Sequence, residues 1–133
     1  MAELDMPYIA MAGNHDRRRT CLDMIKAAPR DANDFVQGTQ QTPHGLFVFL
    51  DTLDETSHAG EMCGKRLGWL AETLAAAPAE TPFVVFMHHP PFAVGIEAMD
   101  NIALKQSREF AEAIAPYRAR IRHLFFGHVH RPI

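Results

Sequence analysis

The 133-residue sequence is poor in cysteine, with Cys21 and Cys63 alone, and it has no apolar run close to the ~20 residues that span a bilayer. Two cysteines do not make the disulfide framework of a small secreted domain. The formal charge of −3 gives no reason to expect a nucleic-acid partner. The first residues lack the basic and apolar segments of a secretory signal peptide. We therefore expect no nucleic-acid partner, no membrane partner and a cytoplasmic location.

Histidine is the residue type that stands out, with eight copies among 133 residues. The remaining composition, 47% apolar and 22% charged, is that of an ordinary globular protein. The length suits one domain, and the sequence shows no repeat, low-complexity tract or linker. Residues 1–133 are therefore interpreted as a single domain.

Strands are predicted where short stretches of the sequence are apolar almost throughout. Four such stretches stand at residues 8–12, 46–50, 83–87 and 123–126. Continuous apolarity is typical of strands that are buried on both faces, as in parallel sheets. The stretch 35–45 fits a further short strand and a turn that leads into 46–50.

Helical patterns lie between the predicted strands. Residues 20–28 open with Thr20 and Asp23 at the spacing of a capping box. Residues 64–78 and 101–117 each place their apolar side chains on one helical face. Strands that alternate with helices predict βαβ units and hence a layered α/β fold.

Polar and ionisable side chains gather where three of the predicted strands end, in "GNHD" (13–16), "MHHPP" (87–91) and "GHVH" (127–130). In open α/β sheets, ligands bind outside the carboxyl ends of the strands. Imidazole nitrogen, amide oxygen and carboxylate are ligands for borderline divalent metals such as Fe, Mn, Zn or Co. On extended backbone His128 and His130 would point the same way and suit adjacent metals. The three strand ends therefore predict a shared metal site.

Several other polar residues receive a plainer interpretation. Asp51 ends the predicted strand 46–50 and is counted at the same edge of the sheet. The three arginines of 17–19 are interpreted as a solvated face at the start of a helix. Three histidines are interpreted as polar residues that enter loops: His44, His58 and His123.

Taken together and in this order, the three strand-end motifs resemble those of the calcineurin-like metallophosphoesterases. The spacing also fits, with 74 residues from Asn14 to His88 and 40 from His88 to His128. "HHPPFAVGIEAMD" (88–100) is similar to one branch, the class III cyclic nucleotide phosphodiesterases and the related glycerophosphodiesterases. The resemblance implies an αββα sandwich with a mixed sheet flanked by helices. It also implies hydrolysis of small-molecule phosphodiesters, such as cyclic nucleotides or glycerophosphodiesters, by a metal-bound hydroxide.

The resemblance also assigns roles to individual residues. It implies a dinuclear pair of divalent ions (Fe, Mn, Zn or Co), the first held by Asn14, His88 and His128 and the second by His130. His15 would be catalytic and would lie beside the substrate phosphate. His89 matches the second histidine of the family's pair, and it would support the site and contribute with His15 to substrate binding.

The sequence departs from the family because the family's first two motifs are absent. These are an Asp-x-His motif on the first strand and a Gly-Asp motif whose aspartate bridges the two metals, and the chain stops three residues after His130. We therefore expect a truncated metallophosphoesterase domain that lacks the first and the C-terminal strands. It would bind one metal weakly or none and would be a poor catalyst. Unpaired strand edges and apolar faces would favour a homo-oligomer.

Two other interpretations remain open. The chain could be a non-catalytic α/β remnant that assembles with itself or with a partner. It could instead be a mononuclear hydrolase, with Asn14, His88 and His128 around a single zinc and an open position for water. The metal content of the purified protein would separate these interpretations, since a remnant should carry no stoichiometric metal.

Overall fold

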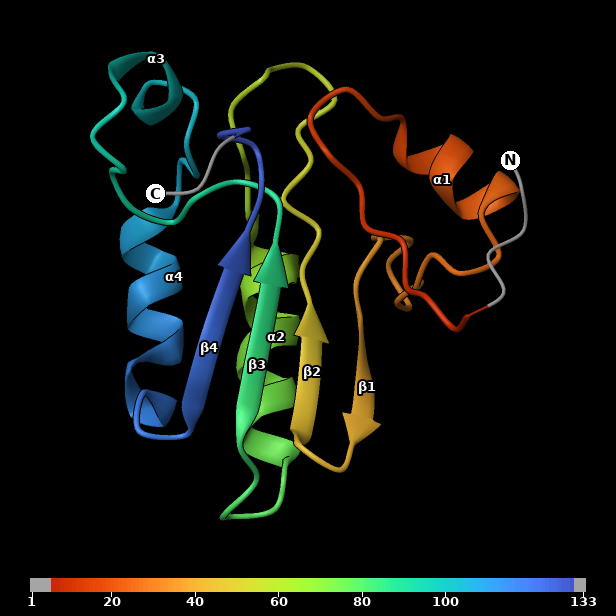
Figure 1. Ribbon diagram of the computed structural model, residues 1–133, viewed down its shortest axis with the longest axis vertical. Coiled ribbons are helices and arrows are strands. Elements are labelled where there is room, and N and C mark those ends of the chain that lie inside the picture. The colour runs from red at the N-terminus through yellow and green to blue at the C-terminus, as the bar shows by residue number, and fades with distance from the viewer. Residues whose placement is uncertain (1–5, 131–133) are drawn as a thin grey trace.

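The computed structural model describes residues 6–130, which form one four-stranded sheet with helices packed against it (Figure 1). The strands are β1 (Gly38–Thr42), β2 (Gly45–Phe49), β3 (Phe83–Met87) and β4 (Ile121–Phe126), and they lie in the spatial order β1-β2-β3-β4. β1 pairs antiparallel with β2, whereas β2, β3 and β4 are parallel. The predicted α/β class with a mixed sheet is confirmed.

The described helices are α1 (Arg18–Met24), α2 (Gly64–Ala76), α3 (Glu97–Asp100), α4 (Ser107–Ile114) and the 3₁₀ helix η1 (Ala115–Tyr117). α2 lies behind the sheet and contacts α4, which lies along the β4 side, whereas α1 lies beyond the β1 edge (Figure 1). None of these helices combines the length and the apolar character that a membrane crossing requires.

The core lies between the sheet and the helix layer. Val48 of β2 and Val85 of β3 point into it, and Leu70 and Leu74 of α2 and Phe110 of α4 meet them there. All five side chains are at most 2% exposed. Each buried side chain of this kind contributes about 1.5–3 kcal/mol relative to an exposed one. This packing holds β2, β3 and β4 in parallel, so that their carboxyl ends meet at one edge.

The opposite face of the sheet carries a row of aromatic side chains. The ring of Phe86 lies 5.3 Å from that of Phe47 and 5.2 Å from that of Phe125. Within residues 6–130 no helix covers this face (Figure 1), and Phe125 is 51% exposed. One face of the sheet is therefore core and the other is an open aromatic surface, which we call the aromatic row.

The predicted strand at 8–12 is wrong. These residues have no regular secondary structure. The N–H of Ala10 donates to the carbonyl of Ala27 instead of to a strand. The stretch 7–11 lies over the sheet, where it lines a hollow of about 560 Å³ with Phe47, Phe49 and other residues. Its apolar side chains thus share the lining of this hollow with part of the aromatic row.

The predicted helix at 20–28 is shifted, because α1 begins at Arg18 and ends at Met24. The capping box is also wrong, since the N-cap is Arg17 and its side chain forms no capping hydrogen bond. A distant residue supplies the missing acceptor: Glu55 Oε1 accepts from the backbone N–H of Arg18 at 3.1 Å.

The predicted helix at 101–117 begins later, at Ser107. Residues before it are tied to two other loops, because the N–H of Leu104 donates to Pro90 and that of Lys105 donates to Gly60. A backbone that makes these long-range bonds cannot also make the helical i→i−4 bonds. Tertiary pairing therefore overrides the local helical pattern here.

Candidate metal centre

The "GNHD" segment forms a tight turn at the carboxyl edge of the sheet. Asp16 Oδ2 accepts from the N–H of Gly13 at 2.7 Å, and the N–H of Asp16 donates back to Gly13 at 3.2 Å. A Cβ at Gly13 would lie 3.1 Å from the ring of His88, so a residue without a side chain suits this close approach. The turn thereby presents Asn14 and His15 beside the end of β3.

Three donor atoms converge beside this turn, one from the turn itself and one from the end of each of β3 and β4. Asn14 Oδ1 lies 3.0 Å from His88 Nε2, and His128 Nδ1 lies 3.2 Å from the same nitrogen. Two ligand atoms bound to one metal at about 2.1 Å are themselves separated by about 3.0–3.4 Å. The observed spacing therefore matches that of ligands around a single cation. The structure brings together the three residues that were predicted to hold the first metal.

The protonation state of these histidines also suits metal binding. Burial, and then the neighbouring His128, lower the pKa of His88 to about 4. Burial, and then His130, lower the pKa of His128. Neutral imidazole is the form that binds a metal. In addition, His128 Nε2 is buried and has no hydrogen-bond partner among the described residues. Two neutral imidazoles and an amide oxygen fit a borderline divalent ion.

His89 lies behind this group, in a fully buried position. Its Nε2 lies 3.1 Å from the carbonyl of His58, to which it donates, and its Nδ1 accepts from the hydroxyl of Thr52 at 2.8 Å. Nitrogens of His88, His89 and His128 lie within 4.8 Å of one another. Both nitrogens of His89 are nevertheless occupied, and no surface of its side chain is open to a substrate.

The backbone of "GHVH" is not extended. The prediction that His128 and His130 point the same way rests on extended backbone, and it is therefore wrong. His128 has φ 68° and His130 has φ 55°, and the N–H of Val129 donates to the carbonyl of Gly127 at 2.7 Å. Left-handed backbone is uncommon for residues other than glycine, and it is incompatible with a strand. The two side chains therefore do not share a strand face. His128 is buried, whereas His130 is exposed.

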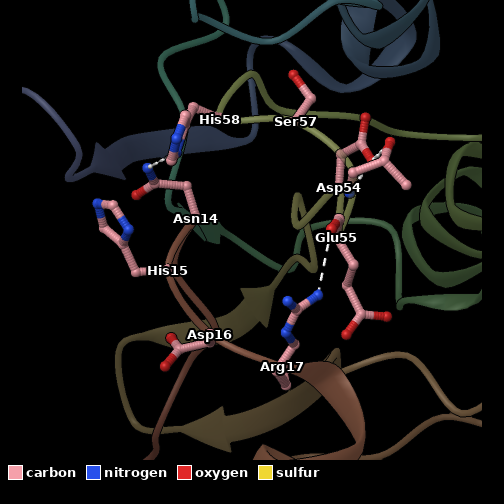
Figure 2. A pocket seen from close by; sticks show the side chains of 9 residues that line it. Asn14, His15, Asp16, Arg17, Asp54, Glu55, Ser57 and His58 are labelled. Carbon is pink, nitrogen blue, oxygen red and sulfur yellow. Dashed lines mark hydrogen bonds between the residues drawn. The ribbon is translucent and has the colours of Figure 1, made fainter.

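Two hollows of about 290 and 330 Å³ flank the donor group, and both are lined by Asn14, His15 and His58. Figure 2 shows the first of them, with the ring of His58 and the amide of Asn14 in contact. The rings of His15 and His58 lie 5.2 Å apart. The predicted catalytic residue His15 is thus at the open side of the donor group.

His58 does lie in a loop, as predicted, but its side chain also reaches this site and contacts Asn14. No spacing in the sequence indicates the contact, since Asn14 lies 44 residues away. His44 does lie in the turn between β1 and β2, but the loop interpretation is wrong for His123, which lies within β4.

Asp51 belongs to a separate buried cluster. Its carboxylate accepts from Arg18 Nε at 2.7 Å and from the N–H groups of Val36 and Leu53 at 2.8 and 2.9 Å. Arg66 Nη1 lies 3.4 Å away. Both oxygens of Asp51 are thus occupied, so Asp51 follows β2 at the predicted edge of the sheet but belongs to a cluster separate from the donor group. The solvated-face interpretation is likewise wrong for Arg18, whose side chain is 18% exposed.

The fold and this donor group define an α/β protein with a candidate divalent-metal centre at the edge of the sheet where the parallel strands end. The comparison with known families agrees: the model of the calcineurin-like phosphoesterases matches residues 1–132. The chain belongs to this family, as the strand-end motifs indicated.

Curated relatives identify the branch. A probable cyclic nucleotide phosphodiesterase of Rhodopseudomonas palustris is 44% identical over 135 residues, which cover 100% of this chain and 49% of the relative. A cAMP/cGMP dual specificity phosphodiesterase of Mycobacterium tuberculosis is 31% identical over 140 residues, with 97% and 39% covered. A probable glycerophosphodiester phosphodiesterase of Arcobacter nitrofigilis is 30% identical over 131 residues, with 96% and 47% covered. The chain spans about half the length of the curated relatives it matches, or less.

Proposed function

We propose that this chain is the metal-binding part of a metal-dependent phosphodiesterase. The observation that carries the proposal is the convergence of Asn14 Oδ1, His88 Nε2 and His128 Nδ1, with separations of 3.0 and 3.2 Å from the central nitrogen. The names of the relatives supply the substrate class, which is a small-molecule phosphodiester such as a cyclic nucleotide or a glycerophosphodiester.

Asn14, His88 and His128 would hold one divalent ion, which could be Fe, Mn, Zn or Co. When bound, such an ion would polarise a phosphoryl oxygen and lower the pKa of a coordinated water. His130 would contribute to a second ion beside it. The lowered pKa of His88, about 4 because of burial, keeps its ring neutral and ready to bind at pH values near neutrality.

Two histidines would serve the substrate and the ligands. His15 lies on the open side, where its ring can donate a hydrogen bond to a phosphoryl or leaving-group oxygen. His89 would act as a support instead, since its ring lies 4.9 Å from that of His88 and is anchored by Thr52. We therefore place His89 in the framework of the site and leave substrate contact to His15.

A mononuclear centre is the second candidate, and the ligand count within the described residues 6–130 favours it. Three donors converge on one position, whereas His130 stands alone for a second ion among residues 6–130. One tight site would bind and polarise a diester without the two-metal clamp. We therefore expect the isolated chain to be a weak catalyst that binds at most one metal per chain tightly.

The remaining predictions concern the chain as a whole. Residues 1–133 are proposed to form one domain that acts in the cytoplasm, with no membrane or nucleic-acid partner. The exposed aromatic row supports a homo-oligomer, because contiguous apolar surface of this kind commonly marks an interaction site.

The test is a metal titration of the metal-free protein, with binding monitored by calorimetry and by the visible spectrum of Co²⁺. We expect one equivalent to bind, with slow hydrolysis of bis(p-nitrophenyl) phosphate that depends on it. The substitution His88→Ala should weaken binding about 100-fold or more, since it removes the central donor. His44→Ala, at an exposed turn away from the site, is the matched control and should bind normally. A chain that takes up no metal, or whose binding survives His88→Ala, would refute the proposal and favour a non-catalytic remnant.

A further inference from the structure

His58 contacts one member of the donor group with its ring and the supporting residue His89 with its backbone carbonyl. Its ring Nδ1 lies 3.3 Å from Asn14 Nδ2, and its backbone carbonyl accepts from His89 Nε2 at 3.1 Å. The residue lies in the loop between β2 and α2 and is exposed, so it forms no part of the core. Its contacts are instead directed at one predicted ligand and at the support behind the ligands.

The ring contact determines which end of the Asn14 amide faces the donor group. An amide presents a donor at one end and an acceptor at the other. With Nδ2 turned to His58 Nδ1, the oxygen Oδ1 is turned to His88 Nε2, 3.0 Å away. A rotation of the amide by half a turn would place the nitrogen there instead. Divalent ions bind the oxygen of an amide, so only the observed orientation makes Asn14 a ligand.

The carbonyl contact fixes the tautomer of His89. Because Nε2–H donates to His58, Nδ1 is left to accept from Thr52 at 2.8 Å. The His89 ring stands edge-on to that of His88, with an interplanar angle of 89°, and it lies 4.7 Å from the ring of His128. The loop that carries His58 thus orients the ligand Asn14 directly. It also holds His89, which packs against the rings of His88 and His128.

We propose that His58 is a positioning residue of the metal centre, which uses its ring Nδ1 as an acceptor to hold the Asn14 oxygen toward the ion. This inference rests on the proposed function, since it concerns the affinity of the same site. Outer partners of metal ligands are worth about 10–100-fold in metal affinity. The ring of His58 is therefore expected to matter for binding although it is not itself a ligand.

Two substitutions separate the acceptor from the bulk of the ring. His58→Leu keeps an apolar side chain of comparable size without an acceptor, and His58→Asn restores an acceptor near the position of Nδ1. The dissociation constant for Co²⁺ should rise about 10–100-fold in His58→Leu and should stay within about threefold of wild type in His58→Asn. His44→Leu makes the same change at an exposed turn and should leave the constant unaltered.

A second measurement needs no metal. In the metal-free protein, the side-chain amide protons of Asn14 should show a nuclear Overhauser contact to Hε1 of His58. The melting temperatures of the wild type, His58→Leu and His58→Asn should be similar, because His58 is exposed. Equal Co²⁺ affinity in wild type and His58→Leu, or equal loss in both variants, would overturn the inference. Absence of the Overhauser contact would overturn it as well. Failure of the wild type to bind Co²⁺ would instead refute the proposed function.

Discussion

Gly60 packs its backbone directly against the ring of His89. A Cβ at Gly60 would lie 2.5 Å from Cγ of that ring, a separation that side chains do not reach without movement. Gly60→Ala should therefore destabilise the protein by about 1–3 kcal/mol, because a buried ring must shift. Gly68→Ala is the matched control, since nothing lies within 4 Å of that position in helix α2. It should stabilise the protein by about 0.4–1 kcal/mol. Urea unfolding of the two variants checks the opposite signs, and a neutral Gly60→Ala would contradict the packing.

The buried histidines predict an acid-sensitive fold in the absence of metal. Burial lowers the pKa of His89 to about 3 and that of His88 to about 4, from about 6.5 in an unfolded chain. Between these values the unfolded state binds protons that the folded state does not, so stability is complete above about pH 6.5 and falls as the pH drops. The loss between about pH 7 and pH 5 should reach at least about 1 kcal/mol.

Thermal unfolding in EDTA across this range measures that slope. His89→Gln keeps a polar side chain but removes one titrating group, so its curve should be flatter than that of wild type. His44→Gln, at the exposed turn, should keep the wild-type slope. A wild-type melting temperature that is constant down to about pH 5 would show that the folded state accepts these protons freely.

At the level of single residues, the sequence was informative where a ligand follows a strand and silent where a loop returns to the site. Asn14, His88 and His128 each come directly after an apolar stretch or a glycine, an order that predicts a shared site, and the family resemblance singles out these three as ligands of one metal. His58 could not be found in this way, because its contact with Asn14 depends on the path of a loop. The left-handed backbone of His128 could not be predicted either, because histidine has no strong preference for that conformation.

At the level of elements, Asp51 joins the end of β2 to helix α1 and to α2. Its buried carboxylate is paired with Arg18 at 2.7 Å and lies 3.4 Å from the buried Arg66. Asp51→Asn should destabilise the fold by about 3–5 kcal/mol, because two guanidinium groups lose their buried counter-charge. Circular dichroism in urea measures this loss. Arg19→Gln, which breaks an exposed pair with Asp23, should cost less than about 1 kcal/mol, and equal losses in the two variants would contradict the argument.

The elements differ in how far the sequence alone predicts them. β3 occupies 83–87 as expected, since it lies between two neighbouring strands and every side chain but that of Phe86 is buried, so its apolar stretch is unambiguous. α1 was misplaced because its start depends on Asp51 and Glu55, which lie far away in the sequence. The stretch 8–12 has the sequence of a strand without forming one, because apolarity alone does not distinguish pairing within a sheet from packing beside it.

At the level of the whole molecule, the aromatic row gives the sheet one open face. Phe86 lies at its centre, stacked on Phe125 at 5.2 Å, and Phe125 is 51% exposed. Burial of this surface against a second copy would remove apolar area from water, which favours association by roughly 25 cal/mol per Å² before the entropic cost of association is subtracted. We therefore expect the sedimentation coefficient to rise with protein concentration.

A pair of phenylalanines makes this prediction specific to the face. Phe125→Ser removes an exposed ring from the aromatic row and should abolish the concentration dependence, with little loss of stability because half of the side chain already meets water. Phe92 is equally exposed, at 53%, but lies in the loop after β3 and contacts Phe126 instead. Phe92→Ser should therefore associate as wild type does. If the wild-type chain sediments as a monomer at every concentration, or if the two variants behave alike, the sheet face is not the interface.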